Sequence, residues 1–220
     1  MIVFYRLKSD SPNMRKISIM LDEIGASYAV KHIEAHDDSM NDAEFKRISP
    51  TQTMPAILDT ETGVALFESG AILQYLAEKS GRLLASDLET KAETIKWLMF
   101  EAANLCPVLM ELHHYLMSDV GDYPESLLQR YKDKVAQFCE ILDRQLNGRD
   151  YLVDQYSIAD IAIYPWTVAL EDLADVDITA YPNLTAWIER LNHRSENFTA
   201  TNLALTDWCF ENGSVKVCNA

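Results

Sequence analysis

Residues 51–79 read TQTMPAILDTETGVALFESGAILQYLAEK, and the predicted fold is built around this stretch. Two short apolar runs, one opening at Pro55 and one closing at Phe67, flank a polar turn sequence, which predicts a β-hairpin. Proline is tolerated at the first residue of a strand but costs a ladder donor inside one. Apolar residues then recur at helical spacing from Ser69 to a stop near Gly81, so we expect the hairpin to run directly into a helix with Ser69 as its N-cap.

The junction between this hairpin and this helix has the chemistry of a binding site. The first N–H groups of a helix have no partner within the helix and can donate to a carboxylate. Glu68, beside them, can accept hydrogen bonds from an ammonium group. Together these groups suit the α-amino-acid end of a ligand. A purely structural interpretation competes with this one, because Ser69 can cap the helix and Glu68 can interact favourably with its dipole.

The residues before this stretch alternate between strand and helix patterns. Ser11 and Pro12 are typical of a helix start, at the N-cap and at the first helical position, and Gly25 is typical of a helix end. The basic residues of this part, Lys16 among them, are expected to be solvated surface charges. The expected elements are a strand over 2–7, a helix from 12 to Gly25, a strand over 28–33, an acidic loop over 36–40, a short helix over 42–48, the hairpin and its helix. This β-α-β-α-β-β-α order predicts a mixed sheet with helices on both faces, the thioredoxin-like arrangement.

The pattern changes after Gly81, where strands give way to long helices over 89–117 and 123–146, and to shorter ones that begin near 157 and 182. Pro107 is expected to kink or divide the first of them. Ser157 and Asp160 suit reciprocal capping of a later helix. The predicted parts are a thioredoxin-like α/β domain over 1–79, a linker over 80–88, an all-helical domain over 89–210 and a loose tail over 211–220.

Composition excludes several classes of function. The 220 residues carry a formal net charge of −15, which disfavours nucleic acid and anionic lipid as partners. No apolar run approaches the roughly 20 residues of a membrane helix, and the amino terminus lacks a signal-peptide pattern, so we expect a soluble, cytoplasmic protein. The four cysteines are widely spaced. His113 and His114 are adjacent on a predicted helix, where side chains point about 100° apart, so no metal is expected.

The order of the first elements carries a family resemblance. Pro-Ala-Ile-Leu at 55–58, a turn, and then Phe-Glu-Ser-Gly-Ala-Ile-Leu-Gln-Tyr-Leu-Ala-Glu-Lys at 67–79 resemble the glutathione-binding half of the cytosolic glutathione transferases. The resemblance implies the glutathione transferase fold, a homodimer, and glutathione as the cosubstrate. It implies that Met54 pairs through its backbone with the cysteinyl part of glutathione, before a cis-proline at Pro55. It also implies that Glu68 and Ser69 hold the γ-glutamyl end.

Within that family the chain resembles the bacterial nu class, also called disulfide-bond reductases. Ser11-Pro12-Asn13 is similar to the Thr-Pro-Asn stretch of that class, with serine in place of the threonine. Thr53 stands where the class tends to carry lysine. The resemblance implies that Ser11 donates to the thiol sulfur, that Asn13 assists, and that Arg130 reaches the ligand from the helical domain. Further matching segments run through nearly the whole chain, at 47–50, 66–73, 113–114, 130–131 and 156–166.

Two other side chains are candidates for the group that handles the thiol. A free thiol with a pKa of about 8.5 is only a few per cent ionised at neutral pH, so such a site must favour the thiolate. Tyr5 precedes the loop that leads to Ser11, and tyrosine serves in other transferase classes; its alternative role is that of a packed strand aromatic. Ser9 is the third candidate. No cysteine occurs before Cys106, which disfavours a cysteine mechanism.

The leading hypothesis is a glutathione transferase that activates the glutathione thiolate and reduces disulfide bonds with it. That chemistry needs no redox cysteine in the protein, because one glutathione attacks the disulfide and a second resolves the mixed disulfide. Conjugation of glutathione to electrophiles is the alternative activity. A non-enzymatic glutathione-binding or regulatory module is the alternative class, because a fold alone does not define a function. The sequence leaves open the second substrate and the number of glutathiones per subunit.

Overall fold

The computed structural model describes residues 1–8, 11–33, 42–117, 123–168, 170, 174, 176–194, 208–211 and 214–217. The chain forms two compact units, Met1–Leu84 and Ala85–Ala220. The boundary between the units falls inside the stretch 80–88 that the sequence predicts as a linker. The acidic loop expected over 36–40 lies outside the described residues.

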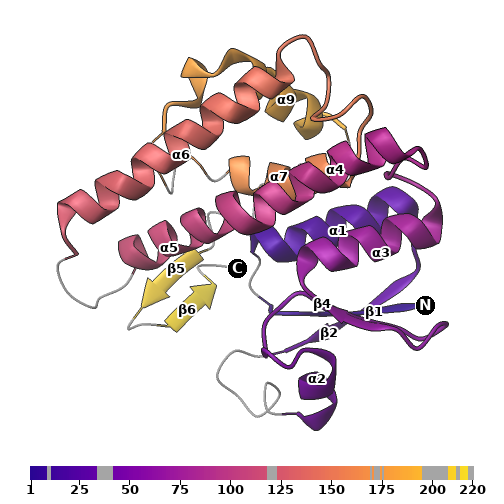
Figure 1. Ribbon diagram of the computed structural model, residues 1–220. Helices are drawn as coiled ribbons and strands as arrows, with labels where there is room; N and C mark the ends of the chain where they lie inside the picture. The colour runs from indigo at the N-terminus through magenta and orange to yellow at the C-terminus, as the bar shows by residue number, and fades with distance from the viewer. Residues whose placement is uncertain are drawn as a thin grey trace. The chain divides into compact units, whose positions relative to one another are not determined.

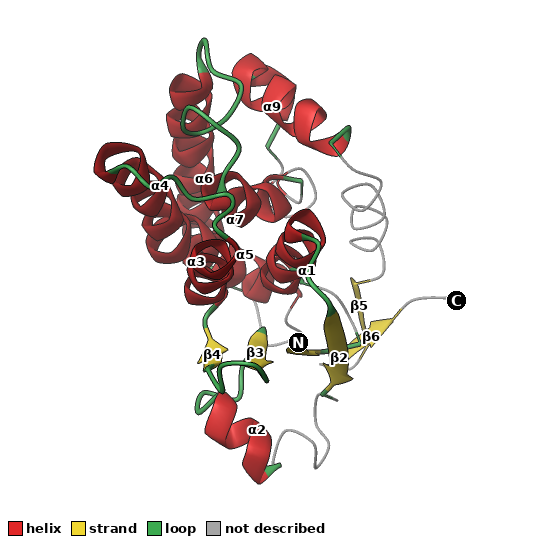
Figure 2. Cartoon of the chain, turned by 90° about the vertical axis from the view of Figure 1, so that its right-hand side faces the viewer, coloured by secondary structure: helices red, strands yellow, loops and turns green. Residues whose placement is uncertain are grey.

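The first unit is a four-stranded mixed sheet with helices on both of its faces (Figure 1). Its elements are β1 Ile2–Arg6, α1 Pro12–Ile24, β2 Tyr28–His32, α2 Ala43–Ile48, β3 Ala56–Asp59, β4 Ala65–Phe67 and α3 Ser69–Ser80. The strand order is β2-β1-β3-β4; β1 is parallel to β2, and the other two pairs are antiparallel. Helices α1 and α3 pack side by side on one face, and α2 covers the other (Figure 2). This arrangement confirms the predicted thioredoxin-like fold.

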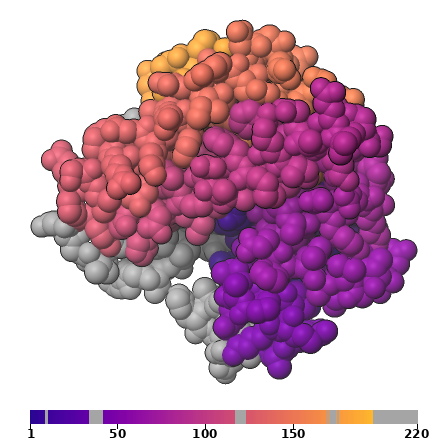
Figure 3. Space-filling model, in the orientation of Figure 1, coloured from indigo at the N-terminus to yellow at the C-terminus, as the bar shows by residue number. Residues whose placement is uncertain are grey.

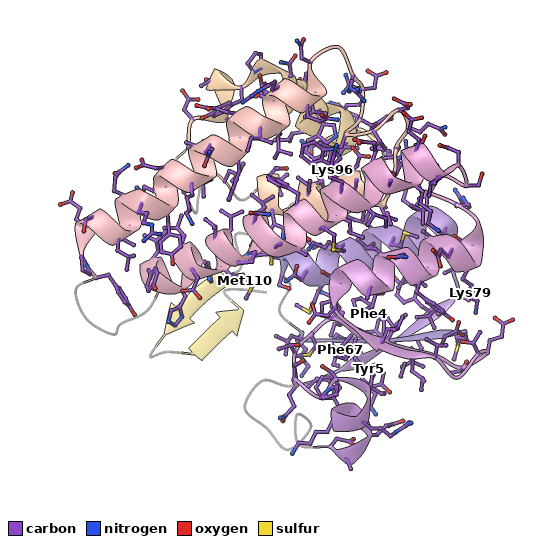
Figure 4. The ribbon with its side chains drawn as sticks, in the orientation of Figure 1. Phe4, Tyr5, Phe67, Lys79, Lys96 and Met110 are labelled. Atoms are coloured by element: carbon purple, nitrogen blue, oxygen red, sulfur yellow. The ribbon has the colours of Figure 1, made fainter. Side chains whose placement is uncertain are left out.

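Alternation along β1 divides the core of this unit between the two faces of the sheet. Phe4 and Tyr5 are both buried, but successive strand residues point to opposite faces. Tyr5 packs with Phe45 and Ile48 of α2, and the half-buried Phe67 of β4 joins this cluster (Figure 4). Phe4 therefore faces α1 and α3.

A buried carboxylate ties the hairpin to the end of α3. Asp59, the last residue of β3, accepts hydrogen bonds from the Tyr75 hydroxyl at 2.6 Å, from the backbone N–H of Glu61 at 3.0 Å and from Lys79. Lys79 lies in the last turn of α3 (Figure 4) and also pairs with the Glu61 carboxylate at 2.8 Å. Burial raises the pKa of Asp59, but these donors outweigh burial and hold the pKa well below its ordinary range.

The second unit consists mainly of helices. They are α4 Leu88–Phe100, α5 Cys106–Met117, α6 Glu125–Leu146, α7 Ile158–Thr167 and α9 Pro182–Asn192, with a π-helical turn at Glu101–Leu105 and a 3₁₀ turn at Ile178–Ala180. Helices α5 and α6 pack together, and the space-filling view shows their side chains as one continuous surface (Figure 3). No helix within the described parts of the chain has both the length and the apolar character needed to cross a bilayer.

Pro107 divides the helix that the sequence predicts over 89–117. A proline has no backbone N–H, and its ring clashes with the carbonyl four residues earlier in a regular α-helix. The chain contains a π-helical turn just before it, in which the N–H of Cys106 bonds the carbonyl of Glu101. The predicted helix is therefore divided into α4 and α5 by this turn, and Pro107 itself lies at the second position of α5.

A second buried carboxylate organises the start of α7. Asp160 accepts hydrogen bonds from the backbone N–H groups of Ser157 and Leu152, each at 3.0 Å, from the Trp187 indole at 2.9 Å and from the Ser157 hydroxyl at 3.3 Å. Ser157 in turn accepts from the N–H of Ala159 at 3.2 Å. The reciprocal capping predicted for Ser157 and Asp160 is thus confirmed. Burial raises the pKa of Asp160 to about 6, although each of these donors favours the charged form.

The end of the chain differs from the expectation. Strands β5 Trp208–Glu211 and β6 Ser214–Val217 form an antiparallel pair, so the all-helical domain over 89–210 and the loose tail over 211–220 are corrected for these residues. Asn212-Gly213, between the apolar run Trp208-Cys209-Phe210 and the alternating Val215-Lys216-Val217, is a hairpin signal in the sequence. Helical periodicity, on which the expected tail was based, does not reveal a strand pair this short.

Candidate active site

Three strands of the first unit bring the predicted site residues to one edge of the sheet. Tyr5 of β1 pairs with Ala56 of β3, and Ala56 pairs with Phe67 of β4. Extending this antiparallel register by two residues places Pro55 opposite Glu68 and Met54 opposite Ser69. The chain also leaves β1 at this edge before it enters α1. Segments that are far apart in the sequence therefore converge where the hairpin runs into α3.

The peptide bond between Met54 and Pro55 is cis, as the family resemblance implies. Pro55 is buried. Met54 is half-buried and packs against the cluster on the α2 side of the sheet. The predicted backbone contact of Met54 with a ligand stays a prediction.

Ser11 lies at the start of α1 in the predicted capping position. Its backbone is extended, with φ −149° and ψ 156°, and its hydroxyl oxygen accepts from the N–H of Met14 at 3.3 Å. Because the oxygen is the acceptor in this bond, the hydroxyl proton can be donated elsewhere. Ser11 is half-buried, at a helix end where the dipole favours negative charge. The Ser11 hydroxyl and the helix dipole would each stabilise a thiolate placed beside Ser11.

Glu68, and not Ser69, is the N-cap of α3, which corrects the expected helix start by one residue. The Glu68 side chain makes no capping hydrogen bond and Ser69 does not occupy the cap position, so capping does not explain Ser69. Glu68 has φ 71° and ψ 114°, a region that costs a non-glycine residue about 1–3 kcal/mol. Its side chain is exposed. An exposed carboxylate on a strained backbone, beside uncapped helix N–H groups, is typical of a ligand-binding position.

Lys16 connects the starts of the two helices. Its ammonium donates to Oδ1 of Asn13 at 2.6 Å and to Oγ of Ser69 at 3.2 Å. The side chain is only 1% exposed, so the expectation of a solvated surface charge at Lys16 is wrong. Asn13 and Ser69, which the resemblance implies for opposite ends of a ligand, thus share one buried cation. The i, i+3 spacing of Asn13 and Lys16 was the available signal, but the sequence does not show the bond across to α3.

The remaining candidates have other environments. Tyr5 is 1% exposed and stacks on Phe45 with ring centroids 5.9 Å apart, and burial raises the pKa of its hydroxyl. Core packing accounts for Tyr5, and the assignment of the thiol partner stays a prediction. Ser9 lies outside the described residues. Arg130 is exposed on α6, in the second unit, and its reach toward a ligand stays a prediction.

The two adjacent histidines differ in their burial. His113 is half-buried, and burial lowers the pKa of its imidazole, whereas His114 is exposed. Wherever the structure describes the chain, no group of three or more His, Cys, Asp or Glu side chains is placed to hold a metal ion.

Comparison with known proteins shows the family. The family models for the glutathione S-transferase N-terminal domain and C-terminal domain match residues 7–78 and 105–195. The disulfide-bond oxidoreductase YfcG of Escherichia coli (strain K12) is 34% identical over 190 residues, which cover 84% of this chain and 87% of the relative. The chain belongs to the glutathione S-transferase family. The recognition made from its motifs is confirmed.

Solved structures of other family members share the fold of this chain. A glutathione transferase from Pseudomonas putida, with one glutathione disulfide bound per subunit, has a TM-score of 0.81 and 32% identity over 91% of this chain and 90% of that one. A glutathione transferase family member from Pseudomonas fluorescens pf-5, with two glutathione bound, has a TM-score of 0.81 and 33% identity over 91% of this chain and 92% of that one. The sheet edge with Met54, Glu68 and Ser69 belongs to the matched glutathione S-transferase N-terminal domain.

Proposed function

We propose that the protein is an enzyme that binds glutathione at this sheet edge and uses it to reduce disulfide bonds. The observation that carries the proposal is the convergence of Asn13 at the start of α1 with Ser69 at the start of α3, through Lys16. The glutathione and glutathione disulfide in the two Pseudomonas structures support the choice of ligand. The name of the Escherichia coli relative, a disulfide-bond oxidoreductase, supports the choice of reaction.

The γ-glutamyl end of glutathione would bind at the start of α3. Its carboxylate would accept hydrogen bonds from the uncapped helix N–H groups and from Ser69, and its ammonium would donate to Glu68. The backbone of Met54, beside the cis bond to Pro55, would pair with the cysteinyl residue. Arg130 would add a further contact with glutathione.

The thiol would then face the start of α1, where Ser11 and Asn13 favour its anion. The Ser11 hydroxyl and the Asn13 amide can each donate a hydrogen bond to sulfur, and the helix dipole adds partial positive charge. These interactions lower the thiol pKa and raise the fraction of thiolate at neutral pH. Binding and thiolate activation, and not proton transfer by a side chain, would therefore carry the catalysis.

The reaction is two successive thiol–disulfide exchanges. The first glutathione thiolate attacks one sulfur of the substrate disulfide, the S–S bond breaks, and the released thiolate takes up a proton. A mixed disulfide of glutathione and substrate remains. A second glutathione thiolate attacks the glutathione sulfur of that mixed disulfide, which releases the second substrate thiol and forms glutathione disulfide. The substrate gains two electrons and two protons, and two glutathiones supply them.

Two assays on the same preparation test the proposal. Reduction of hydroxyethyl disulfide by glutathione is compared with conjugation of glutathione to chlorodinitrobenzene. Fast reduction with slow conjugation is the expected result. Fast conjugation alone would replace the proposal with the alternative of a conjugating transferase. Silence in both assays, with the protein still retained on immobilised glutathione, would replace it with a non-enzymatic binding module.

We also propose a homodimer that works in the cytoplasm without a bound metal, which the family likeness supports. Analytical ultracentrifugation should give twice the chain mass of 25.0 kDa. Activity should be unchanged by a chelator, and the protein should fractionate with cytoplasmic markers. A monomer, a loss of activity with the chelator, or recovery with membranes would each overturn the corresponding part.

A further inference from the structure

Lys16 is a buried cation whose partners lie on two different helices. Its side chain is 1% exposed, and its Nζ lies 2.6 Å from Oδ1 of Asn13 and 3.2 Å from Oγ of Ser69. Asn13 is in the first turn of α1, Ser69 is the first residue of α3, and these two helices pack together. A buried ammonium is costly unless it is hydrogen-bonded, so these contacts also hold Lys16 in its place.

The hydrogen-bond chemistry of an ammonium constrains both partners. An ammonium has three donors and no acceptor. Asn13 therefore turns its carbonyl oxygen toward Lys16, and its NH₂ group points away from the ammonium. Ser69 accepts from Lys16 through its oxygen, so its hydroxyl proton is directed elsewhere. Without such a neighbour, an amide and a hydroxyl can each either donate or accept.

We propose that Lys16 is a positioning residue that prepares both ends of the glutathione site. By binding the acceptor side of Asn13 and Ser69, it orients the Asn13 NH₂ as a donor to the thiolate and the Ser69 hydroxyl as a donor to the γ-glutamyl carboxylate. One buried ammonium thus orients a donor for each of these two anionic groups of the ligand. The inference rests on the proposed function for the identity of the ligand, but it does not depend on which reaction follows.

Three substitutions separate hydrogen-bond polarity from size and charge. Lys16→Arg keeps a side chain that only donates, Lys16→Gln keeps hydrogen bonding but can both donate and accept, and Lys16→Met removes hydrogen bonding. The other charged residues at these helix starts, Arg15 and Glu68, stay unchanged. Lys96→Met, at an exposed lysine on α4 that pairs with Glu93, is the matched control.

Each end of the site has its own readout. Calorimetric titration with S-methylglutathione reports on the γ-glutamyl end, because this ligand has no ionisable thiol. The pH dependence of the ultraviolet thiolate absorbance of bound glutathione reports on the sulfur end. Lys16→Gln and Lys16→Met should weaken S-methylglutathione binding about tenfold and raise the apparent pKa of the bound thiol by about one unit. Lys16→Arg should retain most of both properties, and Lys96→Met should retain all of both.

Double variants test whether Lys16 acts through its two partners. If it does, Lys16→Met should add little to the affinity loss of Ser69→Ala and little to the thiol pKa shift of Asn13→Ala. Additive effects in both cycles, or a Lys16→Gln protein that matches the wild type, would overturn the inference. If Lys16→Met does not fold by circular dichroism, the cycles are run with Lys16→Gln. A wild-type protein that binds neither glutathione nor S-methylglutathione would overturn the proposed function itself, together with this inference.

Discussion

Replacing Glu68 with glycine is expected to raise the stability of the protein and to weaken glutathione binding. Glu68 occupies φ 71° and ψ 114° at the N-cap of α3, where its side chain makes no capping hydrogen bond. The side chain is exposed, so its removal costs the fold little packing. The two effects come from different atoms, because the Cβ atom causes the strain and the carboxylate is the group that we propose binds the ligand.

The structure sets the size of both effects. The strained backbone costs about 1–3 kcal/mol, which glycine relieves. Glycine also raises the entropy of the unfolded chain, and this opposing effect destabilises the fold by about 0.4–1 kcal/mol. A net gain of about 1 kcal/mol raises Tm by about 2–4 °C in a chain of this length. Loss of a charge-assisted hydrogen bond to the ligand ammonium costs about 1.5–3 kcal/mol, which lowers glutathione affinity roughly 10- to 150-fold.

Glu68→Ala is the matched control, because it removes the carboxylate but keeps the Cβ atom. Thermal unfolding and calorimetric titration with glutathione are measured for the wild type and both variants. The glycine variant should be the most stable of the three, and the two variants should bind glutathione equally weakly. A glycine variant less stable than the alanine variant would refute the argument from strain. A glycine variant that binds like the wild type would refute the assignment of the carboxylate to the ligand.

Three further predictions concern the sulfur site and the two buried carboxylates. Ser11→Ala should lower kcat roughly 10- to 100-fold, through loss of a hydrogen bond to the thiolate, with a smaller change in glutathione Kd. Ser11→Asn keeps an N-cap residue and therefore controls for helix stability. Equal losses in kcat and in glutathione affinity for Ser11→Ala would contradict thiolate activation. Because the folded pKa of Asp59 is depressed, its contribution to stability is fully present above about pH 3.9 and is lost as the pH falls through the lower folded value. Lys79→Met should therefore make the unfolding free energy fall less steeply with acid in denaturant titrations, and an unchanged slope would show that Lys79 does not hold that pKa down. Asp160→Ala leaves the Trp187 indole and two backbone N–H groups without their acceptor. It should lower the unfolding free energy by about 3 kcal/mol or more, measured by denaturation followed by tryptophan fluorescence. A loss below about 1 kcal/mol would contradict a central role for this carboxylate.

Several elements of the structure were predictable because the interactions that form them are local. Ser11-Pro12 and Gly25 mark the two ends of α1, since capping and backbone preference act over a few residues. Ser157 and Asp160 mark the start of α7 for the same reason. The antiparallel hairpin that ends at Phe67 follows from the spacing of two apolar runs around a turn.

The start of α3 was harder to predict because the chain turns sharply there from a strand into a helix. Serine is favoured over glutamate as an N-cap, so Ser69 was the expected N-cap. In the structure Glu68 takes that position with a positive φ, and Ser69 is the first helical residue. The surrounding sheet and helix determine this backbone, and propensity alone does not.

The amino-acid sequence alone was enough to predict the family, the mixed sheet of the first unit and the order of its elements. It also singled out Ser11, Asn13, Met54 and the Glu68-Ser69 pair as candidate site residues. Those conclusions depend on spacing and on local chemistry, which a single chain displays directly. The burial of Lys16 and its contact with Ser69, which is 53 residues away from it in the sequence, became visible only in the folded chain. A lysine is by default a surface charge, and it becomes a buried donor only when the packing of α1 against α3 encloses it.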